Sequence, residues 1–446
     1  MKFFVHKLGC PKNDVDADYI SARLIFEGHE PVKKPEDAES IIVNTCGFIL
    51  PAQEESINEI LRLADLKKSG RLKTLYAAGC LSQRHGDEML KEMPELDGAF
   101  GLGAVDSIAK AVTGSTKNDK VIKMEARKLG YLSWNNRFID SDDPYAYLKI
   151  SDGCDRGCTY CAIPGMRGKF RSRPLDSIIR EAEYLAENGK KELILVSQEA
   201  TLYGYNYKGP EKPDVITLLE ELDKVKGVEW IRLMYLYPHQ LDQRMIEYIT
   251  DPANKTLNYF DLPLQHINDE ILTGMNRRVT RKQTEDQLAM IRNCSNDAII
   301  RTTFIVGFPG ETDAQFEELN QFVADFRFDR LGVFAYSQEE DTPAALLPNQ
   351  IDEAIKQERA DIIMTTQLDI AFEKNNSLID TIQNVIIDSV NDDGSAVGRS
   401  YADCPEVDLD IAVTGENLKI GDILPVKITS VEGYDLFGQV VNNDTV

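Results

Sequence analysis

The chain of 446 residues lacks the features that mark membrane and secreted proteins. It has no apolar run near the length of a membrane span, and it opens with MKFFVHKLGCPKNDVD in place of a charged head and a long apolar core. It has only eight cysteines, too few for a disulfide framework in a chain of this size. These absences predict a globular protein of the reducing cytoplasm, with thiols free to bind metal.

Basic residues are scarce relative to acidic ones. The 50 Lys and Arg face 74 Asp and Glu, which gives a formal net charge of -24. Residues 376–446 contain thirteen acidic residues and three basic ones, Arg399, Lys419 and Lys427. Such a surface repels phosphate backbones and attracts basic partners. The composition therefore argues against RNA binding by the C-terminal segment, although solubility alone also explains an acidic surface.

Three cysteines, Cys154, Cys158 and Cys161, form a C-x3-C-x2-C motif. An iron–sulfur cube needs four ligands, so three thiolates leave one iron open. S-adenosylmethionine chelates such an iron through its amino and carboxylate groups, which predicts a radical enzyme. The alternatives are a zinc knuckle, a disulfide fragment or three structural thiols. Zinc lacks partners, because no second C-x2-C or H-x3-H pair occurs in the sequence.

Three further cysteines each follow a predicted strand. Strands are expected at KFFVHKLG, SIIVNT and TLYAAG, with helices at DYISARLIFEG, ESINEILRLADL and GDEMLKEM. Cys10, Cys46 and Cys80 follow the three strands, and the carboxyl ends of parallel strands share one edge of a sheet. We therefore predict that these cysteines converge on a second iron–sulfur cluster. The alternative is a chance placement of buried thiols.

The apolar pattern predicts an α/β chain with five segments. Residues 1–115 form a parallel-sheet domain, and residues 116–143 form a connector. Residues 144–350 carry six strand–helix repeats, typical of a partial TIM-like barrel. Residues 351–375 are predicted to form a linking helix. Five short strands in residues 376–446 predict a small antiparallel β-barrel.

The segments around the six cysteines resemble the methylthiotransferase family of radical S-adenosylmethionine enzymes. The resemblance covers the whole chain, through LGCPKN, VNTCGFI, AAGCLSQR and YCAIPGMRGKFRSRP, and its C-terminal barrel is similar to a TRAM domain. Within the family, these segments resemble the branch that modifies an aspartate of small-subunit ribosomal protein twelve. The branch that acts on tRNA adenosine carries different residues beside the same cysteines.

The resemblance implies two 4Fe–4S clusters and S-adenosylmethionine as cofactors. Cys154, Cys158 and Cys161 would hold the cluster that cleaves S-adenosylmethionine to a 5′-deoxyadenosyl radical, which takes a hydrogen from the aspartate β-carbon. The three N-terminal cysteines would hold the cluster that presents sulfur, and a second S-adenosylmethionine would supply the methyl group. The sequence identifies neither an electron donor nor a sulfur source.

The implied partner is a basic ribosomal protein of the small subunit, which suits the acidic C-terminal segment. The nearest alternative is a tRNA adenosine methylthiotransferase, which the acidic charge disfavours. A third alternative is a non-catalytic iron–sulfur or zinc protein that docks on ribosomes.

Polar residues at the predicted strand ends are candidate contacts for S-adenosylmethionine. They are Gln198, Glu199, Gln265, Gly307 and Glu311. The first pair is placed to meet the amino group of the methionine part, although a polar helix start explains it equally. The segment TFIVGFPGET resembles a contact to the adenosine part through its backbone and its glutamate. The neighbouring His266 is a candidate for ribose or substrate, or a buried structural histidine.

A basic run, Arg167, Lys169, Arg171 and Arg173, follows the motif. It is expected to bind the carboxylates of the cofactor or the target aspartate, or else to be a solvated loop with salt bridges. The two remaining cysteines, Cys294 and Cys404, have no cysteine neighbours and are predicted to be structural thiols.

Overall fold

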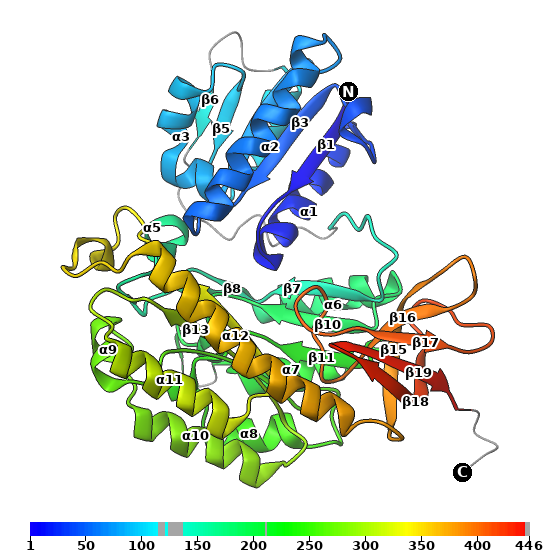
Figure 1. Cartoon of the computed structure of the whole chain (residues 1–446). Helices are drawn as coiled ribbons and strands as arrows, with labels where there is room; N and C mark the ends of the chain where they lie inside the picture. The colour runs from blue at the N-terminus through cyan, green and yellow to red at the C-terminus, as the bar shows by residue number, and fades with distance from the viewer. Residues whose placement is uncertain (115–120, 124–136, 210–211, 442–446) are drawn as a thin grey trace.

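The computed structural model describes residues 1–114, 121–123, 137–209 and 212–441, which fold into three parts (Figure 1). The N-terminal part, blue in the figure, sits above a central half-barrel in green and yellow, and a small β-barrel in orange and red lies beside the half-barrel. The predicted α/β class is confirmed. Within the described ranges, no helix has the length and apolarity to cross a membrane.

The N-terminal part is a parallel sheet with the strand order β2-β1-β3-β4-β5-β6. Its strands are β1 (Lys2–Lys7), β2 (Glu30–Pro31), β3 (Ser40–Thr45), β4 (Thr74–Gly79), β5 (Gly98–Phe100) and β6 (Val121–Lys123). Its helices are α1 (Pro11–Phe26), α2 (Leu50–Lys68), α3 (Cys80–Glu92) and α4 (Val105–Val112). The predicted strands and helices are present, but α1 and α3 begin earlier than predicted, directly at the cysteine-bearing turns.

Helices cover both faces of this sheet, because the central strand β3 is apolar on both sides. Ile42 packs in one cluster with α1 and α4, whereas Ile41 and Val43 pack in another with α2 and α3. The first of these clusters continues into the half-barrel, where it includes Tyr147 and Ile194. The N-terminal part and the half-barrel therefore share an apolar core.

The half-barrel contains the six predicted strands, in chain order. They are β7 (Tyr145–Lys149), β10 (Glu192–Val196), β11 (Trp230–Leu233), β12 (Tyr259–Gln265), β13 (Ile299–Val306) and β14 (Arg330–Ala335). All ladders are parallel, but they form two three-stranded sheets rather than one. A single bridge between Ile231 and Thr256, just before β12, joins the two sheets.

Helices pack on the outside of the half-barrel, and short elements decorate its loops (Figure 1). The longer helices are α6 (Leu175–Glu187), α7 (Val215–Asp223), α8 (Gln243–Thr250), α10 (Arg281–Cys294), α11 (Asp313–Phe326) and α12 (Glu353–Asn376). The short elements are β8 (Ser151–Asp152), α5 (Ile163–Arg167), β9 (Arg171–Ser172), α9 (Asp269–Gly274) and single 3-10 turns at Pro35–Asp37, Ala200–Leu202, Pro238–Gln240 and Pro343–Leu346. The predicted linking helix, α12, packs against α11 and β14.

The small barrel is closed, in the order β15-β16-β17-β19-β18. Its strands are β15 (Ile382–Val390), β16 (Ala396–Ser400), β17 (Ile411–Thr414), β18 (Ile423–Glu432) and β19 (Asp435–Val440). The prediction of an antiparallel barrel is wrong at one pairing, because β17 and β19 run parallel. The reason is geometric: a closed ring with an odd number of strands cannot alternate direction at every step.

The loop between β16 and β17 enters the amino-terminal end of the half-barrel. Asp403 accepts hydrogen bonds from Arg330 at 2.5 Å, and Asp408 accepts one from the Tyr259 hydroxyl at 2.6 Å. Cys404 is 2% exposed and packs with the apolar cluster that the N-terminal part and the half-barrel share. The small barrel thus closes one end of the half-barrel and leaves the carboxyl ends of the strands facing the N-terminal part.

The predicted connector, 116–143, falls largely outside the described residues, but two pieces of it are folded. Residues 121–123 are the edge strand β6, paired with β5. Arg137 is buried, and its Nε donates to Asp18 of α1 at 2.8 Å while Nη1 lies 3.2 Å from Glu181 of α6. These pieces therefore belong to the folded body.

Glu192 is a buried carboxylate between two buried arginines, so Glu192→Gln should loosen the junction between half-barrel and small barrel. Glu192 accepts from Arg232 at 2.7 Å and from Arg399 at 2.8 Å. Removing one side of a buried ion pair costs about 3–5 kcal/mol, because the other charge stays uncompensated. We expect urea denaturation to show a loss of this order and limited proteolysis to release the small barrel. Lys224→Met, which removes an exposed pair with Glu221, should change neither; equal effects would contradict this account.

Candidate functional site

The three loops that carry Cys10, Cys46 and Cys80 lie against one another, as predicted. A Cβ built on Gly9 would come 2.8 Å from the Cβ of Cys46, and one on Gly47 would come 2.9 Å from the carbonyl carbon of Cys80. Gly9 also has a φ of 92°, which favours glycine. The loops can therefore pack this closely only because glycine stands beside the cysteines.

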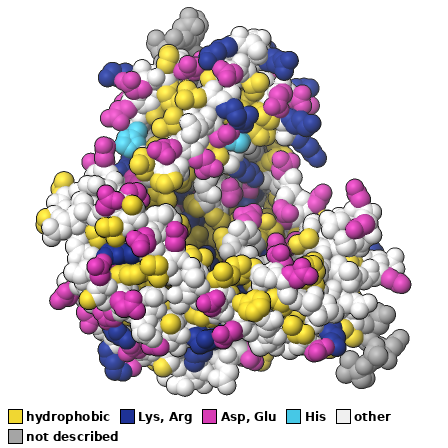
Figure 2. Space-filling view, viewed as in Figure 1, with side chains coloured by type: hydrophobic (Ala, Val, Ile, Leu, Met, Phe, Trp, Pro, Cys, Tyr) yellow, Lys and Arg dark blue, Asp and Glu magenta, His cyan; other side chains and the backbone are white. Residues whose placement is uncertain are grey.

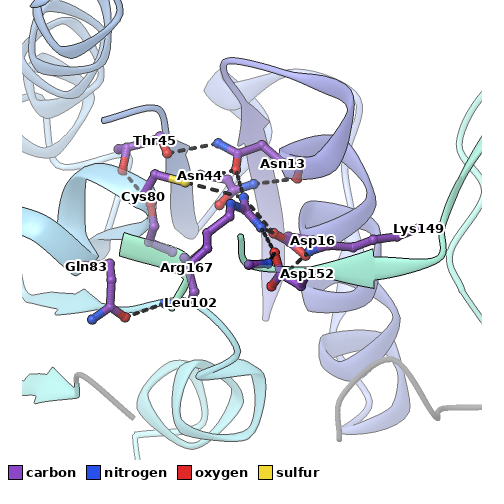
Figure 3. Close-up of polar contacts among 12 residues, drawn as sticks. Asn13, Asp16, Asn44, Thr45, Cys80, Gln83, Leu102, Lys149, Asp152 and Arg167 are labelled. Atoms are coloured by element: carbon purple, nitrogen blue, oxygen red, sulfur yellow. Dashed lines mark hydrogen bonds and ion pairs between the residues drawn. The ribbon is translucent and has the colours of Figure 1, made fainter. Parts of the chain in front are cut away.

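Asn13, in the first turn of α1, ties the three loops together (Figure 3). Its amide donates to the carbonyls of Leu8 at 3.1 Å and Thr45 at 3.0 Å. Its Oδ1 accepts from the thiol of Cys80 at 3.5 Å, and the side chain of Asn44 donates to its backbone carbonyl at 2.6 Å. One buried side chain thus fixes the ends of β1, β3 and β4 relative to each other.

Arg167 joins this site to the C-x3-C-x2-C loop. It ends α5, which follows Cys161 directly, and its side chain crosses to the N-terminal part (Figure 3). Nη2 donates to Asn13 at 2.7 Å and to the Cys80 sulfur at 3.3 Å, while Nη1 donates to Asp152 at 3.1 Å. Asp16 of α1 lies 3.2 Å from the same guanidinium.

The alternative of a solvated basic loop is wrong for two of the four residues in the basic run. Arg167 and Arg173 are each 1% exposed, and Arg173 is paired with Glu181 of α6. Arg171 donates to the carbonyls of Lys169 and Arg167 at 2.8 and 3.0 Å. The run looked exposed because it contains no acidic residue itself: Arg167 pairs with Asp16 and Asp152, and Arg173 pairs with Glu181 on the following helix.

Burial decides the protonation of the thiols. It raises the pKa of Cys46 to about 12 and that of Cys80 above its usual value. In the other set, burial raises the pKa of Cys154 to about 11 and that of Cys161 to about 12. Buried thiols of this kind lose their protons only to a strong cationic partner such as iron. These four thiols therefore fit metal ligands better than free nucleophilic cysteines.

The loop that carries the C-x3-C-x2-C motif is held at both ends. The amide of Cys154 donates to the carbonyl of Gly168 at 3.1 Å, and Asn276 donates to the carbonyl of Gly157 at 2.8 Å. A Cβ on Gly153, whose φ is 79°, would lie 2.2 Å from the carbonyl oxygen of Lys169. The loop is thus fixed to the turn before β9 and to the residues after α9.

In the described part of the chain, no group of three or more His, Cys, Asp or Glu side chains is placed to hold one metal ion. The thiolates of an iron–sulfur cube bind different irons and stand apart, whereas the ligands of zinc surround one ion.

The two cofactor contacts predicted after β10, Gln198 and Glu199, differ in their hydrogen bonds within the protein. Both polar atoms of the Gln198 amide are buried without a hydrogen-bond partner among the described residues. Glu199, in contrast, accepts from Arg156 at 2.6 Å and from Thr201 at 3.2 Å. An orphaned buried amide at the carboxyl end of a strand fits a bound polar ligand, since such a group is costly when it stays unpaired.

The contacts predicted after β12 and β13 are engaged within the protein. The amides of Gly307 and Phe308 donate to Glu311 at 2.8 and 3.3 Å, and Arg359 of α12 donates to the same carboxylate at 2.9 Å. These bonds order the loop after β13, and a contact of Glu311 with adenosine stays a prediction.

Gln265 and His266 lie side by side at the end of β12. Gln265 has a left-handed φ of 74°, and its amide reaches the carbonyl of Pro263 at 3.4 Å. The Nδ1 of the buried His266 accepts from the amide of Asn268 at 3.0 Å, while its Nε2 has no hydrogen-bond partner in the described structure and lies 3.7 Å from Oε2 of Glu311. Their contacts with a ligand also stay predictions.

Sequence reasoning missed several cations that stack on tyrosine rings near the cysteines. Arg156 and Arg277 lie 4.2 and 4.4 Å from the centre of the Tyr237 ring, and Lys12 lies 3.4 Å from that of Tyr235. The signal was present in LGCPKN and LMYLYP, where a lysine follows Cys10 and two tyrosines follow a strand.

The two remaining cysteines differ in burial. Cys404 is buried, as a structural thiol should be, whereas Cys294 is exposed at the end of α10. The prediction of a structural thiol is therefore wrong for Cys294, which is not buried.

Comparison with known proteins identifies the three parts of the chain. Residues 2–101 match the uncharacterized protein family UPF0004, residues 148–323 match the Radical SAM superfamily, and residues 380–441 match the TRAM domain. A relative from Acetivibrio thermocellus, named ribosomal protein uS12 methylthiotransferase RimO, is 43% identical and covers 100% of this chain and 99% of its own length. The chain belongs to the uS12 methylthiotransferase family.

Further members of this family are equally similar. The relative of the same name from Clostridioides difficile is 42% identical, with 99% of both chains covered, and that from Syntrophomonas wolfei is 44% identical over 97% of this chain and 98% of its own. Family membership and the radical domain make the chain a radical S-adenosylmethionine methylthiotransferase, with an iron–sulfur cluster and S-adenosylmethionine as cofactors.

Solved structures of distant radical enzymes share the fold. The methyltransferase TsrM from Kitasatospora setae superposes with a TM-score of 0.52 at 15% identity, over 74% of this chain and 72% of its own. The cobalamin-dependent enzyme OxsB gives a TM-score of 0.52 at 13% identity, over 82% of this chain and 56% of its own. At such identities the likeness concerns the fold alone.

Asp14, in the first turn of α1, should make stability depend on pH. Burial first, with Glu406 adding to it and Lys7 opposing it, raises the pKa of Asp14 from 3.8 to about 7. A carboxyl with a raised folded-state pKa binds more protons folded than unfolded, so it costs stability as pH rises between these values. Asp14→Asn should therefore gain stability over the wild type from pH 4 to 8, measured by urea denaturation at each pH. Parallel curves for the two proteins would rule out this role.

Proposed function

We propose that this chain methylthiolates the β-carbon of an aspartate in ribosomal protein uS12. The observation that carries the proposal is the bridge from α5 to the N-terminal cysteine loops. Arg167 binds Cys80 at 3.3 Å and follows Cys161 by only a short helix. Two sets of three thiols thus share one buried anchor, and the relatives of this architecture are named for the modification of uS12.

Each cysteine set is assigned to one 4Fe–4S cluster. Cys154, Cys158 and Cys161 would hold the cluster that binds S-adenosylmethionine, and the unpaired Gln198 amide would pair with the polar end of that cofactor. When bound, these groups supply the radical chemistry that removes hydrogen from an unactivated carbon, which no acid or base in a protein deprotonates readily. The chain itself fixes the loops, buries Cys46 and Cys80 and sets the distance between the two sites.

Cys10, Cys46 and Cys80 would hold the second cluster. Three converging thiols leave one position of a cube open, and the glycines beside them bring loop backbones close to the sulfurs. An open position in this place suits the delivery of sulfur to a carbon held between the two sites. The surface is hollowed between the N-terminal part and the rest of the chain, as Figure 2 shows, with apolar side chains around the hollow.

The small barrel is the expected docking surface for a basic protein. Some of its acidic residues are consumed internally, as Asp403 and Asp408 pair with the half-barrel. The acidic residues that stay exposed are Asp380, Asp392, Asp393, Glu406, Asp410, Glu416, Glu432 and Asp435. This exposed charge favours a basic ribosomal protein of the cytoplasm and disfavours tRNA, the alternative substrate.

The proposal is tested by offering both substrates to the anaerobically reconstituted and reduced protein with S-adenosylmethionine. We expect a methylthio mass gain on an aspartate of uS12 and none on unmodified tRNA, measured by mass spectrometry. The same gain on a tRNA adenosine would move the chain to the tRNA branch. Absence of any S-adenosylmethionine cleavage would instead favour a non-catalytic protein.

The number of clusters has a separate test. Cys10→Ala, Cys46→Ala and Cys80→Ala combined should remove about half of the iron while sparing reductive cleavage of S-adenosylmethionine, because the other set is intact. Cys294→Ala is the matched control, since this exposed thiol lies apart from both sets, and it should leave iron content unchanged. Unchanged iron in the triple variant would show that the N-terminal thiols are structural.

A further inference from the structure

Lys12 occupies an unusual place for a lysine, in the first turn of α1 and two residues after Cys10. Its side chain is 8% exposed, and its ammonium lies 3.4 Å from the centre of the Tyr235 ring. Lysine is rarely buried without an anionic partner, because the desolvated charge is costly. A tyrosine face offsets part of that cost but brings no opposite charge.

Tyr235 places Lys12 at the boundary between the N-terminal part and the half-barrel. It follows β11, at the carboxyl end of the half-barrel, with a left-handed φ of 61°. Its carbonyl accepts from the amide of Ala200, in the loop that also carries Gln198 and Glu199. The ammonium of Lys12 therefore stands where the N-terminal part meets the predicted cofactor side of the half-barrel.

Three other cations of this region already have carboxylates. Arg167 pairs with Asp16 and Asp152 at 3.2 and 3.1 Å, and Lys149 pairs with Asp16 at 2.7 Å. Arg156 is paired with Glu199. For Lys12, no carboxylate in the described part of the chain lies within ion-pair distance. Arg277, which is 7% exposed, has no carboxylate partner either, but its guanidinium donates to the carbonyl of Pro263 at 2.6 Å and lies 4.0 Å from the sulfur of Cys158. Lys12, which lies over the Tyr235 ring, is available to an external anion.

We propose that Lys12 binds the side-chain carboxylate of the target aspartate, an inference that rests on the proposed function and names a substrate-binding residue for it. The reacting β-carbon is bonded directly to that carboxylate, so one charge-assisted hydrogen bond would hold the carbon between the two cysteine sets. An adenine base is neutral and offers no such group. The same contact would therefore select an aspartate over a purine.

The competing role for Lys12 is to balance the negative charge of the neighbouring Cys10 thiolate once iron is bound. The two roles differ in what they make sensitive to substitution. Binding of the carboxylate makes Lys12 matter only for substrates that carry this charge. Charge balance makes it matter for iron content and for the signal of the cluster, whatever the substrate.

A double-mutant cycle separates the roles. The reconstituted wild type, Lys12→Met and Lys12→Arg are each titrated with labelled uS12 that carries either the target aspartate or asparagine there. Binding is read by fluorescence anisotropy without reductant, so that no turnover occurs. The wild type should prefer the aspartate form by roughly ten- to hundredfold. Lys12→Met should lose this preference, and Lys12→Arg should keep most of it.

Lys91→Met, which removes an exposed lysine of α3, is the matched control and should behave as the wild type. Iron content and the electron paramagnetic resonance signal are measured for every variant. A Lys12→Met protein that keeps the preference overturns the proposal, whether or not its cluster signal changes. A wild type that binds the aspartate and asparagine forms equally well also overturns the proposal. That comparison needs no variant of the enzyme.

The proposed function fails separately from this inference. A wild type that binds the aspartate form of uS12 preferentially but produces no methylthio mass gain would overturn the proposed reaction and leave Lys12 as a carboxylate-binding residue. A wild type that neither binds nor modifies uS12 would overturn both.

Discussion

A buried guanidinium must find compensating charge within reach, and in this chain Arg167 finds it across a domain boundary. Its partners Asp16 and Asn13 belong to the N-terminal part, and Asp152 belongs to the half-barrel. Any displacement of the two parts would leave several buried charges unpaired. Each unpaired ion would cost roughly several kcal/mol. The separation between the two cysteine sets is therefore fixed by electrostatics as much as by apolar packing.

Periodicity predicted most of the fold, because each strand and helix here buries a regular apolar face. β3 and β10 each contain an uninterrupted apolar stretch, IIV and LILV. Such stretches are typical of parallel strands that are buried on both faces. The strand-end rule also brought Cys10, Cys46 and Cys80 together without any knowledge of their contacts. These are properties of local sequence and of parallel sheets in general.

The remaining features depend on partners distant in sequence. Arg173 is paired with Glu181 of α6 in the same half-barrel, and Tyr19 of α1 donates to that carboxylate only once the N-terminal part has packed against it. The burial of Lys12 was not predicted, because a single lysine in a turn is normally exposed and its partner Tyr235 lies in another domain. The parallel pair β17 and β19 follows from ring closure and not from the strand pattern. Some acidic residues of the small barrel, such as Asp403 and Asp408, are buried where the barrel packs on the half-barrel. Composition alone does not distinguish them from the exposed ones.

The β16–β17 loop makes the small barrel an integral part of the half-barrel. Asp403 and Asp408 neutralise Arg330 and Arg301, and Cys404 completes an apolar cluster shared by all three parts. A truncated chain that ended after α12 would leave Arg330 without Asp403 and Arg301 without Asp408, and it would open the apolar cluster around Cys404 to water. The small barrel is therefore a structural part of the half-barrel, and another domain could replace it only by supplying the same loop contacts.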